Sequence, residues 1–151
     1  MDIHVTQAIA HQLLTLDEAQ YFFMVRDFTG GIVKAALFGM LIANEDMHFG
    51  NVSLFCPEPL ARKFSLAPAY DMLPMRYRPR DEDPMPDPGF EPPAPHAGVL
   101  EAWAAAVSAA THYWDRVATD TEISAGFRRI AERNRAGVGS LATLPPAAST
   151  R

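Results

Sequence analysis

Three side chains near the middle of the chain have the types and spacing that phosphoryl transfer requires. Asp46 and Asn51 lie five residues apart, and Asp71 follows twenty residues after Asn51. The reaction needs a carboxylate that accepts the proton of the attacking hydroxyl, and oxygen ligands that hold Mg²⁺ against the nucleotide phosphates. Protein kinases use an Asp as the base, and an Asn five residues later and a second Asp as metal ligands. The spacing therefore predicts Asp46 as the base and Asn51 and Asp71 as Mg²⁺ ligands.

The neighbouring elements would place these groups. Residues 32–43 are apolar almost all the way round, which predicts a buried helix that ends just before the polar segment 44–51. Two strand-like runs, 51–55 and 63–66, predict a hairpin that leads into Asp71. This order is the order of a kinase C-terminal lobe. The alternative is that Asp46 caps a turn and Asn51 starts a strand, as Asx residues often do.

Further helices and one irregular segment complete the pattern. Thr15 and Glu18 have capping-box spacing and predict a helix from residue 16 to about 28, which Gly30 and Gly31 would break. Residues 74–95 contain eight prolines and five acidic residues, which predicts a mobile or extended, solvated segment. Apolar residues then recur at intervals of three and four over 100–117, which predicts an amphipathic helix. A second capping box, Thr119 and Glu122, predicts a last helix that ends near residue 137.

These elements predict a mainly α fold with a small β-hairpin (α+β), equivalent to a protein-kinase-like C-terminal lobe. We divide the chain into a catalytic-lobe core with the loop and metal motif at 1–79, a Pro- and acid-rich loop at 80–98, a helical part of the same domain at 99–140, and a frayed tail at 141–151.

Composition excludes several classes of protein. The chain has 151 residues with 13 basic and 18 acidic side chains, so its net charge of −5 argues against direct nucleic-acid binding. Its single cysteine, Cys56, excludes an intrachain disulfide and a Cys-rich zinc site. The longest apolar stretch, 35–43, is far shorter than the roughly 20 residues that span a bilayer. With no apparent secretory signal, we expect a soluble cytoplasmic protein that does not bind membranes.

The two motifs resemble those of a known family. Residues 44–55, NEDMHFGNVSLF, and residues 64–75, FSLAPAYDMLPM, are similar to the C-terminal catalytic region of HipA-like serine/threonine kinases. The resemblance covers about residues 30–79. It implies a bacterial kinase related to toxin–antitoxin systems, with ATP and Mg²⁺ as cofactors, a protein substrate and an antitoxin partner.

By the same resemblance, Asp46 is the catalytic aspartate, and Asn51 and Asp71 are the nucleotide- and metal-binding residues. His48 occupies a position where the family loop also carries a histidine. It is a candidate catalytic residue that would stabilise the loop or approach a phosphate rather than act as the base.

The sequence also departs from the pattern of such kinases, which use an N-terminal lobe with a phosphate-covering loop and a lysine. Neither feature is visible before Asp46, because those residues read as helices and Lys34 lies inside the buried helix pattern. We therefore expect that the N-terminal lobe is absent, that the chain is a fragment or a split subunit whose missing N-lobe is a possible partner chain, and that it has little activity alone.

Three other functions stay open. The string Asp46-x-His48-x-Gly50-Asn51 also resembles the catalytic loop of small-molecule phosphotransferases that act on aminoglycosides or choline. A non-catalytic partner-binding module is the second alternative, with residues 76–95 as a candidate surface. A metal hydrolase that uses Asp46, His48 and Asp71 ranks last, because the other histidines show no ligand spacing.

Overall fold

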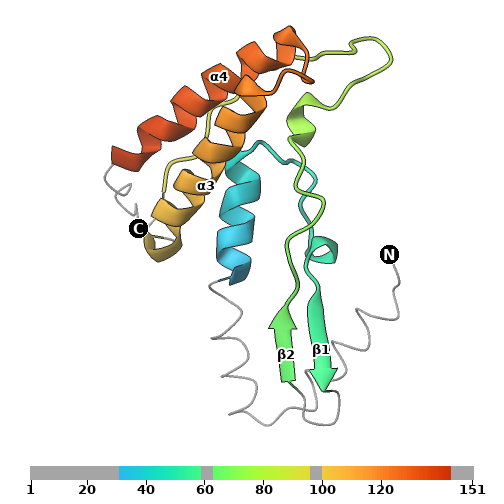
Figure 1. Cartoon of the computed structure of the whole chain (residues 1–151), viewed down its shortest axis with the longest axis vertical. Coiled ribbons are helices and arrows are strands. Elements are labelled where there is room, and N and C mark those ends of the chain that lie inside the picture. Colours follow the sequence, from blue (N-terminus) through green and yellow to red (C-terminus); the bar gives the residue numbers. More distant parts are fainter. Residues whose placement is uncertain (1–30, 59–62, 96–99, 144–151) are drawn as a thin grey trace, which may run out of the picture. The chain divides into compact units, whose positions relative to one another are not determined.

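The computed structural model describes residues 31–58, 63–95 and 100–143 (Figure 1). The chain divides into two compact units. Among the described residues, unit 1 holds 31–32, 48–58 and 63–71, and unit 2 holds 33–47, 72–95 and 100–143. The helix expected at 16–28 and the end of the tail, 144–151, lie outside the described residues.

Unit 1 contains the predicted hairpin. Strand β1 (Leu54–Glu58) pairs antiparallel with β2 (Lys63–Leu66), with Leu54 opposite Leu66 and Phe55 opposite Ser65. The register shifts between Phe55 and Glu58, where Pro57 has no backbone N–H to give to the ladder. The first strand begins three residues later than predicted, because Phe49–Asn51 form a 3-10 turn instead.

Unit 2 is built around helices. Residues 31–41 are helical, and 33–41 of them belong to this unit, in which α3 (Leu100–Thr119) packs against α4 (Ala125–Ser140) (Figure 1). The predicted face of α3 is buried except for Leu100, whose exposed fraction is 41% because it is the first residue of the helix. The core consists mainly of aliphatic and aromatic side chains from these helices, among them Leu41, Ile42, Trp103, Val107, Trp114, Ile130 and Val138.

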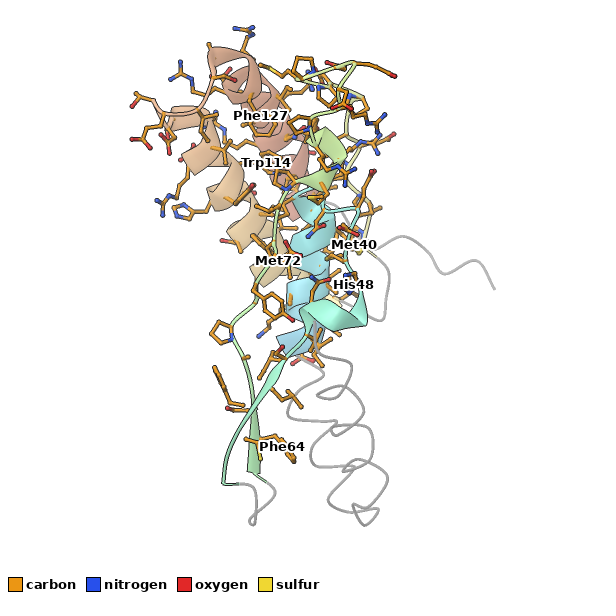
Figure 2. The ribbon with its side chains drawn as sticks, turned by 90° about the vertical axis from the view of Figure 1, so that its right-hand side faces the viewer. Met40, His48, Phe64, Met72, Trp114 and Phe127 are labelled. Atoms are coloured by element: carbon orange, nitrogen blue, oxygen red, sulfur yellow. The ribbon has the colours of Figure 1, made fainter. Side chains whose placement is uncertain are left out.

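Aromatic rings join the helices of unit 2. Trp114 is fully buried, and its indole Nε1–H donates to the carbonyl of Leu41 at 3.0 Å. Tyr77 packs edge-to-face on Trp114 and on Phe127, with centroid distances of 6.2 and 5.7 Å. Figure 2 labels Trp114 and Phe127 within this helical part. The last turn of the helix that precedes residue 44 is therefore fixed to α3.

The proline-rich segment differs from the expected solvated loop. It has no long helix or strand, as predicted, but Tyr77, Pro86 and Pro95 are buried. The Tyr77 hydroxyl exchanges hydrogen bonds with the buried side chain of Asn134 on α4, and Asp87 forms an ion pair with Arg133. All five acids of the segment are exposed, as expected, but the segment is not solvated throughout, because Tyr77 packs on Phe127 of α4 and Pro92 lies beside Gly137 of the same helix.

The start of α4 also corrects the sequence analysis. The hydroxyl of Ser124 caps this helix by accepting from the Phe127 N–H at 3.3 Å, and Thr119 is the last residue of α3 rather than a cap. The capping-box pattern was misplaced because Thr119 continues the preceding helix. The described structure is mainly helical with a two-stranded antiparallel sheet, which confirms the α+β class. Within the described ranges, no helix combines the length and the apolar character that a membrane span needs.

Candidate functional site

The hairpin register brings two of the predicted site residues together. Beyond the strands the pairing continues, because the Ala67 N–H donates to the Ser53 carbonyl at 2.8 Å. The segment that leads into β1 and the segment that follows β2 therefore stay side by side. Asn51 Nδ2 donates to Asp71 Oδ2 at 3.1 Å, so two residues twenty positions apart are in direct contact.

Neighbouring groups fix this pair. The His48 backbone N–H donates to Asn51 Oδ1 at 3.0 Å, which sets the orientation of the Asn51 amide. The Tyr70 hydroxyl donates to the Gly50 carbonyl and lies 3.2 Å from Ser53 Oγ. Asp71 has φ of 58°, a left-handed conformation that Asp tolerates better than most residues. This conformation, next to a tyrosine bonded across the loop, directs the chain out of the hairpin.

The Asn51 and Asp71 side chains fit a divalent cation with a preference for oxygen. Mg²⁺ favours carboxylate and amide oxygens and keeps several water molecules, so one or two protein groups at an accessible site are enough. Asp71 is exposed and Asn51 is half-buried, which leaves the pair open to a nucleotide. An amide oxygen has two lone pairs, so Asn51 Oδ1 can accept from His48 and still offer an electron pair. Each side chain thus carries an oxygen of the kind that Mg²⁺ prefers, and it is the Asn51 Nδ2–H that faces Asp71 in this structure.

Asp46 lies in unit 2, on a segment that is held by the end of the preceding helix and by the Asn44 side chain. The helical residues end in a Schellman arrangement: Ala43 has φ of 61°, and the Asn44 N–H donates to the Gly39 carbonyl at 2.9 Å. A left-handed alanine is strained, and such strain is common next to functional loops. The buried Asn44 side chain then accepts from the Asp46 N–H at 3.0 Å. These bonds fix the backbone at Asp46 and leave its carboxylate exposed.

Arg76 contacts the same segment. Its backbone N–H donates to the Ala43 carbonyl at 3.1 Å, and its guanidinium forms an ion pair with Glu45, the residue before Asp46. The guanidinium Nε–H also donates to the carbonyl of Gly89. One side chain thus joins the Asp46 segment to the proline-rich segment within unit 2.

The structure places the predicted residues as follows. It brings Asn51 and Asp71 together, with the backbone of His48 beside them and an exposed His48 side chain, whereas Asp46 belongs to the other compact unit. Among the described residues, no group of three or more His, Cys, Asp or Glu side chains is placed to hold a metal ion. Lys34 is exposed on the helical residues and does not lie on a strand.

Sequence reasoning missed three residues that shape the site: Asn44, Tyr70 and Arg76. Asn44 precedes Asp46 by two residues, which is the spacing of an Asx turn, so the sequence could have predicted this hydrogen bond. Tyr70 is adjacent to Asp71, but its bond to Gly50 depends on the hairpin register. Arg76 gave no signal, because its partners Glu45 and Gly89 are far from it in the sequence.

The arrangement defines a class: a mainly helical α+β fold with a paired Asn and Asp at the open end of a short hairpin, and a further Asp after a partly buried helix. A family model described as the HipA-like C-terminal domain matches residues 7–139, and the chain belongs to this family. The expected family membership is thus confirmed.

A curated relative supports the same assignment. The chain is 43% identical over 95 residues to a protein named Toxin YjjJ from Escherichia coli (strain K12). The match covers 63% of this chain but only 21% of the relative, so the chain corresponds to about a fifth of that protein. No solved structure matches the chain.

Proposed function

We propose that this chain carries the catalytic-loop and metal-binding part of a HipA-like toxin kinase, which transfers a phosphoryl group from ATP to a serine or threonine hydroxyl of a protein. The contact between Asn51 and Asp71 carries the proposal, because it joins two hard oxygen-bearing groups that the sequence separates by twenty residues. The relative named a toxin supports the biological class.

Each residue has a separate role in this proposal. Asn51 and Asp71 would hold Mg²⁺, and the ion supplies positive charge that neutralises the nucleotide phosphates when it is bound. Asp46 would accept the proton of the attacking hydroxyl as the new oxygen–phosphorus bond forms and the bond from the γ-phosphorus to the ADP oxygen breaks. Asn44 keeps the Asp46 backbone in place through the bond to its N–H. His48 holds the Asn51 amide through its own backbone N–H.

The chain alone should transfer phosphate slowly. Such catalysis depends on positioning and charge stabilisation by groups from two lobes, and the described residues show no phosphate-covering loop. The groups of the other lobe would complete the site, whether the same protein or a second chain carries them. An antitoxin that binds the toxin is the other proposed partner, and it follows from the relative's name alone.

Calorimetric titration with ATP, with and without Mg²⁺, tests the proposal. We expect the chain to bind ATP only when Mg²⁺ is present, and the Asp71→Ala variant to lose at least about tenfold in affinity, or about 1.4 kcal/mol. Asp81→Ala is the matched control, because it removes an exposed carboxylate from the proline-rich segment of unit 2. Equal binding by the wild type and by Asp71→Ala, or no binding by a folded sample, would contradict the proposal.

The substrate class separates the proposal from its alternatives. Transfer of phosphate to a protein hydroxyl would support the kinase, whereas transfer to an aminoglycoside or to choline would favour a small-molecule phosphotransferase. A folded chain that binds no nucleotide but captures an antitoxin would favour the partner-binding module.

A further inference from the structure

We infer that Arg76 is a positioning residue for Asp46: its guanidinium sets the direction of the Asp46 side chain by holding the adjacent Glu45. This inference rests on the proposed function, in which Asp46 is the base. It assigns a role to a residue that neither motif of the sequence contains.

The contacts of Arg76 all lie within unit 2 and come from both its main chain and its side chain. The main-chain N–H bonds to the Ala43 carbonyl, at the left-handed residue where the helix ends. The guanidinium reaches Glu45 on one side and the Gly89 carbonyl on the other. Arg76 is therefore bonded to the two residues that flank Asn44 and, through Gly89, to a segment that packs against α4.

The Asp46 segment needs such a support because it has few others. Residues 44–48 have no helical or strand structure, and the N–H of Asp46 bonds to a side chain two residues earlier. That bond closes an Asx turn across the Glu45 backbone, but it does not hold the Glu45 side chain. Glu45 and Asp46 share one planar peptide unit, so holding the Glu45 side chain restricts the movement of that unit and with it the directions open to the Asp46 side chain.

The second bond of Arg76 makes the ion pair effective. Its side chain is 33% exposed and that of Glu45 is 57% exposed, and an isolated pair with this exposure is weak. The bond to Gly89 holds the planar guanidinium in one orientation before Glu45 binds, so less side-chain freedom is lost when the pair forms. A lysine could keep the charge but not this forked geometry, so Arg76→Lys should restore only part of the function.

Amide hydrogen exchange in the full chain tests the position of the segment. In Arg76→Ala, we expect the Asp46 and Asn44 amides to exchange at least tenfold faster, while the amides of α3 change less than twofold. Arg76→Lys should give intermediate rates. Arg78→Ala is the matched control, since it removes an exposed arginine two residues away and should leave the Asp46 amide unchanged. Unchanged Asp46 exchange in Arg76→Ala would overturn the inference.

Single-turnover phosphoryl transfer from labelled ATP, followed over hours at high protein concentration, tests the role itself. We expect Arg76→Ala to lower the rate constant at least tenfold, to leave the Kd of Mg²⁺–ATP within twofold, and Arg76→Lys to recover part of the rate. An equal loss of nucleotide affinity would show a general structural role and would overturn the inference. Failure of the proposed function is seen separately, as absent Mg²⁺-dependent binding in the wild type, and in that case the exchange rates still decide whether Arg76 positions the segment.

Discussion

At the residue scale, the Asn51–Asp71 pair depends on the tyrosine between the strand and the second aspartate. The Tyr70 hydroxyl bonds to Gly50 and Ser53, which lie on either side of Asn51 and Val52. Tyr70 as a whole is 40% exposed, so it adds little to a core. Its main effect is to hold the two segments that carry Asn51 and Asp71 at a fixed separation, and its removal should therefore affect the ligand more than the fold.

Replacing Tyr70 with Phe removes the hydroxyl and keeps the ring. We expect the Kd of Mg²⁺–ATP to rise about 3- to 10-fold, which corresponds to one hydrogen bond of about 1 kcal/mol, and the free energy of unfolding to fall by less than about 1 kcal/mol. Calorimetry and urea unfolding measure the two quantities. Tyr113→Phe in α3 is the control and should not change the affinity. An unchanged Kd in Tyr70→Phe would refute the role of this hydroxyl.

At the element scale, α3 forms where the apolar periodicity predicts it, because burial of Trp103, Val107 and Trp114 on one face decides its position. In contrast, α4 begins later than the predicted capping box, at Ala125. The hairpin was predictable from alternating residues bounded by polar segments. The packing of the proline-rich segment was not, because Tyr77 and Asn134 are distant in sequence and meet only after the chain folds. The Asn51–Asp71 contact could be predicted only in part. The residue types indicated the pair, but it is the register of the hairpin that brings the two side chains together.

The two tryptophans of α3 should respond differently to the same substitution. Trp114 donates to the Leu41 carbonyl, whereas the buried Nε1 of Trp103 has no hydrogen-bond partner among the described residues. Trp114→Phe should therefore cost about 2–4 kcal/mol from the lost bond and the cavity, and Trp103→Phe at least about 1 kcal/mol less, because it also removes an unsatisfied donor. Urea unfolding compares the two variants. A larger loss in Trp103→Phe would contradict this view of the core.

Tyr77 links the proline-rich segment to α4 and should make stability depend on alkaline pH. Burial raises the pKa of the Tyr77 phenol above its usual value of 10.0. Because the folded pKa exceeds the unfolded one, this contribution is fully present below about pH 10 and is lost as the pH rises through the folded pKa. Tyr77→Phe should reduce the slope of the free energy of unfolding above pH 10.

Urea unfolding between pH 7 and pH 11 measures this slope. Burial also raises the pKa of Tyr113, so Tyr113→Phe should reduce the slope independently, and the double variant should reduce it further. At pH 7, Tyr77→Phe should cost about 1–3 kcal/mol, because it leaves the buried Asn134 without its partner. Identical slopes in the wild type and in both single variants would show that neither phenol is desolvated.

At the scale of the whole molecule, the two compact units differ in what stabilises them. Unit 2 has a core of buried aromatic and aliphatic side chains from three helical segments. The described part of unit 1 is a two-stranded hairpin whose Phe55 side chain is 57% exposed, and a hairpin contributes little stability by itself. Among the described residues, the proposed metal ligands therefore lie in the part with few buried apolar side chains, whereas Asp46 belongs to the unit that holds this core.

This difference should appear in hydrogen exchange. Without ligand, we expect the amides of α3 and α4 to be protected at least about 100-fold more than those of β1 and β2, because the hairpin opens without unfolding the helices. Saturating Mg²⁺–ATP at about 100 times its Kd should raise the protection of the hairpin amides by up to about 2.7 kcal/mol, since the ligand binds only the closed form, and should raise the protection of the helix amides less.

In Asp71→Ala, this ligand-induced protection of the hairpin should disappear, while the difference in protection between the two units remains. Equal protection of the two units in the free chain would mean that they unfold together, and a gain confined to the helices would place the nucleotide away from Asn51 and Asp71.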